Sequence, residues 1–295
     1  MSRLLKDKAA EKSMMALTAC VGLLLFLMVA ALLYKSWPIL ASKPLADLVL
    51  GRSWSPLRGC FGFLPFIMGT LWVTGVSIII AVPVCLLASI FLSEYSPAWL
   101  KDLARPPIDL LAGIPSVVYG VWGVIVVVPF IKNHVGPLFK SSTTGYCVLA
   151  GGVVLAIMIF PVIIHISLEV LAAVKFEVRE VSLALGATRW QTVKHAVLRK
   201  ALPGIIAAVM LGLSRAFGET MAVLMVTGNV ARLPRSVLEP AYALPALIAN
   251  NYGEMLSIPL YDSALLLASL ILLLVTLVFN IISQGILARL ERRVA

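Results

Sequence analysis

The sequence predicts an all-α membrane protein with six transmembrane helices, and two observations carry this prediction. Hydrophobic residues make up 61% of the 295 residues and the mean hydropathy is +1.01, which is more apolar surface than a soluble core of this size can hide. Six stretches also offer about 20 or more residues with few charges, enough to cross the bilayer core. These stretches lie near residues 14–36, 65–92, 109–131, 146–169, 203–227 and 263–287.

The distribution of Lys and Arg sets the expected orientation. With the N-terminus inside, the inner segments hold about twice as many basic residues as the outer ones, as membrane proteins generally do. We therefore expect a multi-pass protein of the cytoplasmic membrane with both termini in the cytoplasm. Basic inner loops beside anionic lipid headgroups account for most of the formal charge of +10, so no nucleic-acid partner is needed.

The first stretch is expected to be a retained span rather than a secretory signal. It is longer than the apolar region of a signal peptide, and no clear cleavage site precedes Tyr34 and Lys35. The cysteines have no metal-ligand spacing, so we expect neither a metal site nor a disulfide framework. They are Cys20, Cys60, Cys85 and Cys147.

The third stretch contains AGIPSVVYGVWG, which allows two interpretations. Its glycines permit close helix packing in lipid. Alternatively, Pro115 frees backbone carbonyls while Ser116 and Tyr119 offer hydroxyl groups to a translocation path. In the fourth stretch His165 is expected to be a packing or interface residue, and we assign it no role.

Between the fourth and fifth stretches lies a basic segment, Glu177–Gly204, called the basic loop below. Gly186 occupies the position of a left-handed helix C-cap, and Thr188 with Gln191 forms a capping box for a second helix. An apolar stripe along that second helix should pack against the protein, leaving its basic residues to water or lipid phosphates. The stripe is Trp190, Val193, Val197 and Ala201.

The fifth stretch places Arg215 and Glu219 about halfway along an apolar segment. Each buried charge costs about 2.5 to 3.5 kcal/mol at such a depth, so something must compensate it. Because the two residues are four apart, we expect them to pair on one helix face in the empty protein. A pair that only neutralised itself could be replaced by apolar residues, and its position therefore favours a functional role.

Several of these segments together resemble the permeases of ATP-binding-cassette (ABC) importers. Glu180, followed by Gly186 six residues later, resembles the EAA loop through which ATPase subunits grip such permeases. Three segments resemble the permease of the Pst-type phosphate importer: LALGATRW, GETMAVLM and AGIPSVVYG. A fourth segment, FGFLPFIMGTL, favours the PstC-type over the PstA-type subunit of that importer. The resemblance runs from Phe61 to the C-terminus. It departs at Val181 and Ser182, where the motif has alanines, and at Arg199, where it has proline.

This resemblance implies a fold, a division of the chain and two sets of site residues. The fold is the type I, MetI-like permease, with an N-terminal span and outer loop at 1–64 and a permease core at 65–295. The substrate path would comprise Arg215, Glu219, Ser214, Thr220, Ser116 and Tyr119. The contact with the ATPase would comprise Glu180, Ser182, Leu185, Gly186, Ala187 and Thr188. The segment ALPALIANNYG resembles a partly buried helical insertion before the last span.

The sequence has no G-x-x-x-x-G-K-[ST] motif and no Gly-Lys dipeptide, so it cannot supply a phosphate-binding loop for ATP. The resemblance implies that two partner ATPase subunits bind ATP and Mg, and that this chain holds no cofactor or metal. It also implies a second homologous permease, an extracytoplasmic phosphate-binding protein and the membrane lipid as partners.

The expected function is translocation of inorganic phosphate by a subunit that is not itself an enzyme. A guanidinium stays charged and meets an oxyanion with two parallel hydrogen bonds, which suits Arg215. Another oxyanion remains an alternative. An intramembrane enzyme is a rival of a different class, although H-E-x-x-H and G-x-S-x-G motifs are absent. A proton-coupled carrier would leave the basic loop unexplained.

Overall fold

The computed structural model describes residues 2–253 and 258–294, and the side chains of the basic tail from residue 290 lie outside this description. Nearly all of the described chain is helical. The principal helices are α1 (Ser2–Ser42), α3 (Leu64–Ile90), α4 (Ala98–Gly113), α5 (Ser116–Trp122), α8 (Val148–Ala173), α9 (Phe176–Ala184), α10 (Arg189–Thr192), α11 (Leu198–Phe217), α12 (Met221–Val226), α13 (Leu244–Asn251) and α14 (Tyr261–Val294). Shorter elements are α2 (Leu45–Leu50), β1 (Trp54–Ser55), η1 (Pro56–Arg58), β2 (Cys60–Phe61), η2 (Phe91–Tyr95), η3 (Gly123–Val127), α6 (Val128–Phe130), η4 (Ile131–Val135), α7 (Gly136–Leu138) and η5 (Val193–Val197).

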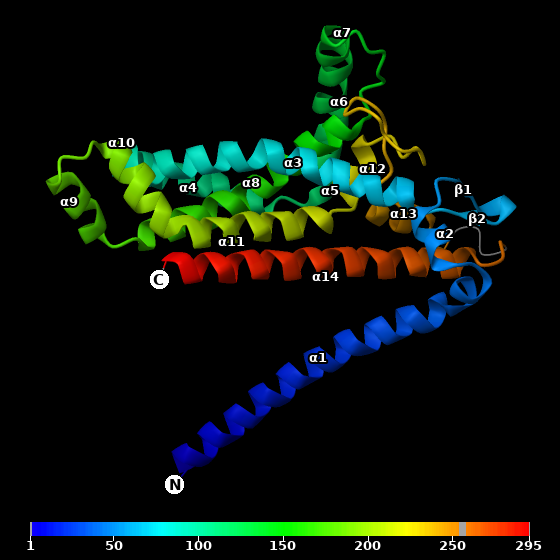
Figure 1. Cartoon of the computed structure of the whole chain (residues 1–295), viewed down its shortest axis with the longest axis horizontal. Coiled ribbons are helices and arrows are strands. Elements are labelled where there is room, and N and C mark those ends of the chain that lie inside the picture. The colour runs from blue at the N-terminus through cyan, green and yellow to red at the C-terminus, as the bar shows by residue number, and fades with distance from the viewer. Residues whose placement is uncertain (1, 254–257, 295) are drawn as a thin grey trace.

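The helices α3, α8, α11 and α14 run alongside one another as a bundle (Figure 1). The central helix is α8, since 56% of its most apolar stretch is buried, whereas none of the corresponding stretch of α1 is. Glycines on α8 let it approach α3 closely; a β-carbon on Gly151 would lie 3.1 Å from Val73 Cγ1. Outside the bundle, α1 slants away on one side, while α6 and α7 project from the other.

The two ends of the bundle differ. One end carries α9 and α10, and α1 begins and α14 ends on that same side (Figure 1). The opposite end carries a small antiparallel hairpin, in which Trp54 faces Phe61, together with α2 and α13. In α13 the first residues are buried and the last are not, which confirms the expected partly buried insertion.

Six helical segments are long and apolar enough to cross a membrane, as predicted. Four of them match the expected windows closely. They are Ala10–Ser42, Leu64–Tyr95, Val148–Ala173 and Tyr261–Arg289.

The prediction for the third window was wrong in its placement. The span is Ser116–Leu138, seven residues beyond the predicted start, and the residues before it form the separate helix α4. Pro115 explains the division, because the residue before a proline is pushed out of helical geometry. Accordingly Ile114 is extended, with φ −68° and ψ 129°.

The fifth window was also placed wrongly. The continuous helical segment is Arg189–Phe217, so it begins in the basic loop and ends ten residues before the predicted end. No proline occurs between Arg189 and Leu202, and α10, the π-helical turn η5 and α11 therefore join without a break. The segment that was expected to finish this span is instead the short helix α12.

Candidate functional site

The helix break between α11 and α12 holds the charged residues of the fifth span. Helix α11 ends partway along the bundle while α3 and α14 continue beyond it (Figure 1). Arg215 lies in the last turn of α11 and its side chain is exposed. A cation is favoured there by the negative end of the helix dipole. The break also ends the backbone hydrogen-bond ladder of the spanning helix at Phe217, which leaves the last carbonyl groups of α11 without helical partners.

The expected ion pair between Arg215 and Glu219 is absent, and that prediction was wrong. Because the helix stops at Phe217, the two residues no longer share a helical turn. Glu219 turns toward α12, where its Oε1 accepts a hydrogen bond from the Ala222 backbone at 3.3 Å. Within the described residues no hydrogen bond or ion pair reaches the Arg215 guanidinium.

Tyr119 is the candidate path residue that links the third span to the preceding helix α4. Tyr119 is buried, and its hydroxyl donates to the Leu111 carbonyl in the last turn of α4 at 2.7 Å. Helix α5 lies against α12 at Gly120, where a β-carbon would approach Ala222 Cα to 3.2 Å. The break in the third span and the break in the fifth are thus packed together.

The remaining candidate path residues are less closely gathered. Ser214 is exposed and donates to Asn280 Oδ1 of α14 at 2.8 Å, on the side of α11 that faces α14. Thr220 donates to the Gly218 carbonyl at 3.3 Å within the break itself. Ser116 is half-buried at the start of α5. Glu219 lines a cavity of about 10 Å³, enough for one water but not for an oxyanion.

The turn of the basic loop confirms the predicted helix C-cap at Gly186 and the predicted capping box at Thr188. Gly186 has φ 84°, and its N–H donates to the Leu183 carbonyl at 2.9 Å while that of Ala187 donates to the Ser182 carbonyl at 3.2 Å. These two bonds define a Schellman C-cap for α9. Thr188 Oγ1 accepts from the Gln191 N–H at 3.3 Å, and Gln191 Oε1 accepts from the Thr188 N–H at 2.9 Å. Two capped helices therefore meet at a fixed angle, further joined by a 2.9 Å hydrogen bond between Ser182 and Thr192.

The apolar stripe on the second helix of the loop was predicted correctly except at one residue. Val193, Val197 and Ala201 are buried, whereas Trp190 is 52% exposed. Trp190 is instead one of several exposed apolar side chains of the basic loop, which include Val181, Leu183 and Leu185, and Phe176 just before the loop is exposed as well. Leu185 is 83% exposed beside the turn. Exposed apolar side chains on a charged segment outside the bundle are available to a docking partner. The other predicted ATPase-contact residues belong to the same segment, in α9 and the turn that follows it: Glu180, Ser182, Gly186, Ala187 and Thr188.

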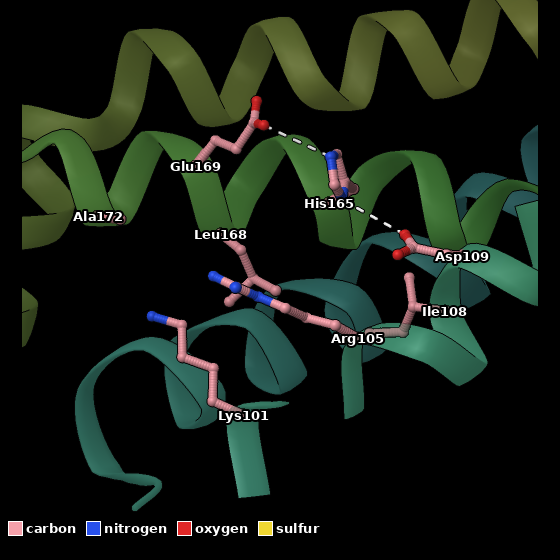
Figure 2. Close-up of a pocket in the computed structure, with 8 residues that line it drawn as sticks. All are labelled: Lys101, Arg105, Ile108, Asp109, His165, Leu168, Glu169 and Ala172. Carbon is pink, nitrogen blue, oxygen red and sulfur yellow. Dashed lines mark ion pairs between the residues drawn. The ribbon is translucent and has the colours of Figure 1, made fainter. Parts of the chain in front are cut away.

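A charged cavity of about 420 Å³ lies between α4 and α8. His165 Nε2 lies 3.4 Å from Glu169 Oε1 and His165 Nδ1 lies 3.9 Å from Asp109 Oδ1, as Figure 2 shows. Lys101 and Arg105 line the same cavity from α4. The His165 side chain is 57% exposed, so these contacts are solvated ion pairs of small energy.

Sequence reasoning missed one paired group, Glu94 with Arg179. The two residues lie 85 positions apart, and neither was singled out from the sequence. A carboxylate at the end of a long apolar helix was the available signal, because such a group requires a partner when it is buried.

Comparison with known proteins assigns the chain to a family. Residues 85–295 match the model of the family described as "Binding-protein-dependent transport system inner membrane component". The chain is 38% identical to a probable ABC transporter permease of Bacillus subtilis, over 94% of this chain and 88% of that one. It is also 38% identical to the phosphate transport system permease protein PstC of Xylella fastidiosa, over 94% and 90% respectively.

Solved structures show the same fold at lower identity. The inward-facing MetNI methionine ABC transporter matches with a TM-score of 0.58 at 20% identity, over 75% of this chain and 93% of that chain. A bacterial alginate ABC transporter matches with a TM-score of 0.58 at 15% identity, over 91% and 93%. The chain therefore belongs to the family of binding-protein-dependent transport system inner membrane components, and it is a multi-pass permease of the ABC importer type.

Proposed function

We propose that this chain carries inorganic phosphate across the cytoplasmic membrane as one permease subunit of an ATP-driven importer. The observation that carries the proposal is the Arg215 guanidinium, which is exposed at a helix break and makes no hydrogen bond or ion pair within the described residues. A desolvated oxyanion needs a donor that stays charged, and a guanidinium offers two parallel hydrogen bonds. Several relatives are phosphate transport system permeases, which supports phosphate as the ion.

Tyr119 and Ser116 would continue this route along α5, with Ser214 and Thr220 flanking Arg215. The free Oε2 of Glu219 would accept the proton of a protonated phosphate once the small cavity beside it opens. Such an acceptor disfavours sulfate, which carries no proton at neutral pH. The route would thus combine a permanent donor with a selective acceptor.

The energy source would be two partner ATPase subunits that bind ATP and Mg, since this chain has no phosphate-binding loop for ATP. Their docking site would be the basic loop, which faces the cytoplasm in this proposal. A second homologous permease would complete the membrane domain, and an extracytoplasmic phosphate-binding protein would deliver the ion. The division into an N-terminal span at 1–64 and a permease core at 65–295 belongs to the same proposal.

The test is purification of the tagged chain followed by reconstitution into vesicles. We expect ATPase subunits to co-purify and the vesicles to take up phosphate when ATP and the loaded binding protein are supplied. Excess sulfate should not compete. Uptake of sulfate in place of phosphate would favour the other-oxyanion alternative, and uptake without any ATPase would contradict the proposal.

A further inference from the structure

The π-helical turn η2 follows α3 directly and ends the second span beside the basic loop. Both helices of the loop contact this turn. Arg179 of α9 meets Glu94 with two hydrogen bonds, Nε to Oε2 at 3.0 Å and Nη2 to Oε1 at 2.6 Å. The Arg189 guanidinium, at the start of α10, lies 6.0 Å from the centre of the Tyr95 ring. Turns of this kind are often found at functional sites. The loop is therefore attached to the second span at two adjacent residues.

Arg179 also reaches a third element. Its Nη1 donates to the Val174 carbonyl at 2.6 Å and its Nη2 donates to the Leu171 carbonyl at 3.0 Å. These carbonyls belong to the C-terminal end of α8, where a helix leaves acceptors unsatisfied. One guanidinium thus binds α3, α8 and α9 together.

This contact is shielded from water. The side chains of Arg179 and Glu94 are 17% and 9% exposed. The hydrogen bond from Arg179 to Glu94 raises the pKa of Arg179 above its ordinary value, so the guanidinium stays charged at every physiological pH. Breaking the contact would leave a buried charge and bare carbonyls, which makes intermediate arrangements unfavourable.

A small apolar core lies beside the pair and joins the same end of the bundle. It is separate from the main core and draws residues from α3, α8, η5 and α11. Its members are Leu171, Val197, Ala201 and Ile205, packed against Leu86, Ile90, Val170, Val174 and Leu198. The inner ends of these helices and the basic loop consequently form one body.

We propose that Glu94 and Arg179 form a joint that transmits movement of the basic loop to the second and fourth spans. This inference rests on the proposed function, because the movement is supplied by the ATPase partners. Arg179 acts as a positioning residue and touches no substrate. Its neighbour Glu180 is exposed and makes no hydrogen bond or ion pair among the described residues, so it is free to meet a partner. Arg179 and Glu180, which are adjacent in α9, would then act in the same coupling step: Arg179 would contact the spans and Glu180 the ATPase.

The test replaces both partners at once, so that no unpaired charge is left behind. In Glu94→Gln with Arg179→Gln, we expect near-normal membrane abundance and co-purification of the ATPase, because no unpaired buried charge remains and the glutamine amides can still donate hydrogen bonds at this site. Phosphate taken up per ATP hydrolysed should fall by about tenfold, since residues along a coupling network commonly alter coupling by such factors. The two single variants should each lose about as much as the double variant, as expected for one interacting unit.

The matched control is Glu11→Gln with Lys12→Gln, which removes one charge of each sign from α1, outside the basic loop. Both residues are exposed and neither makes an ion pair or side-chain hydrogen bond among the described residues. The control should keep the wild-type ratio. An equal loss in the control would overturn the joint, and so would a normal ratio in the double variant. A fall in uptake matched by a fall in abundance or ATPase association would assign Arg179 a structural role instead.

The conservative variant Arg179→Lys covers the case in which the double variant does not accumulate. Lysine keeps the charge but cannot reach Glu94 and both carbonyls together, so the ratio should again fall. Wild-type vesicles measured in parallel separate the two proposals. If they fail to take up phosphate, the proposed function is wrong; if only the variants keep a normal ratio, the joint is wrong.

Discussion

Two arginines at different places in this chain have opposite environments. Arg215, at the helix break, makes no hydrogen bond or ion pair within the described residues. Arg179, beside the basic loop, uses four hydrogen bonds to satisfy one carboxylate and two carbonyls. A charge that must meet a passing ion has to be left without a permanent partner, whereas a charge that must hold helices together is saturated.

The same comparison explains why the predicted pair is absent while a pair that was not predicted is present. A pair between Arg215 and Glu219 would neutralise the cation that the proposed route requires, and the helix break separates the two residues. No such conflict exists at Arg179, where the carboxylate of Glu94 adds rigidity without removing a binding group. The two arginines thus differ both in pairing and in burial, since Arg215 is exposed and the Arg179 side chain is only 17% exposed.

The largest expected effect comes from Arg215→Lys. The ammonium keeps the charge but loses the two-pronged contact with an oxyanion, so phosphate uptake should fall by about 100-fold. Arg215→Ala should be worse, and Arg215→Leu with Glu219→Leu should not restore uptake, because it offers the ion no donor. Uptake per molecule is measured in cells against membrane abundance. Near-normal uptake by the double leucine variant would refute the role given to Arg215.

How much of this site the sequence could predict depended on the range of the interactions involved. The turn at Gly186 and the capping box at Thr188 are local, and both were predicted correctly because the residues concerned lie within six positions of each other. The contact between Glu94 and Arg179 spans 85 residues, and no local pattern encodes it. The helix ends at Gly113 and Phe217 were missed for another reason: a hydropathy window detects apolar length but not a break within it.

A second prediction concerns the basic loop. Gly186→Val places a β-branched residue at φ 84°, which costs about 1 to 2 kcal/mol and should turn α9 away from its docking position. We expect uptake and ATPase association to fall together by about tenfold. Gly186→Asn is the matched control, since asparagine tolerates this conformation and a β-carbon meets nothing within 4 Å. Full ATPase association in the valine variant would show that the loop does not couple the subunits.

The smallest effect should come from His165→Gln. The ion pairs of His165 with Asp109 and Glu169 are largely exposed, and such pairs contribute about 0 to 1 kcal/mol. Phosphate uptake should stay within about twofold of wild type between pH 6 and 8, because no step is assigned to this imidazole. A loss comparable to that of Arg179→Lys would place the cavity between α4 and α8 on the route.

The most direct test of the difference between the two arginines uses a thiol at Ser116, which is half-buried at the start of α5, one turn before Tyr119. In a chain with its four native cysteines replaced, the rate at which an impermeant reagent modifies Ser116→Cys is measured during ATP-driven turnover. Phosphate delivered by the binding protein should slow this rate by about tenfold if the ion occupies the route. The account predicts that Arg215→Lys abolishes this protection while Arg179→Lys leaves it intact whenever phosphate is bound. Protection that survives Arg215→Lys, or that never occurs, would contradict the account.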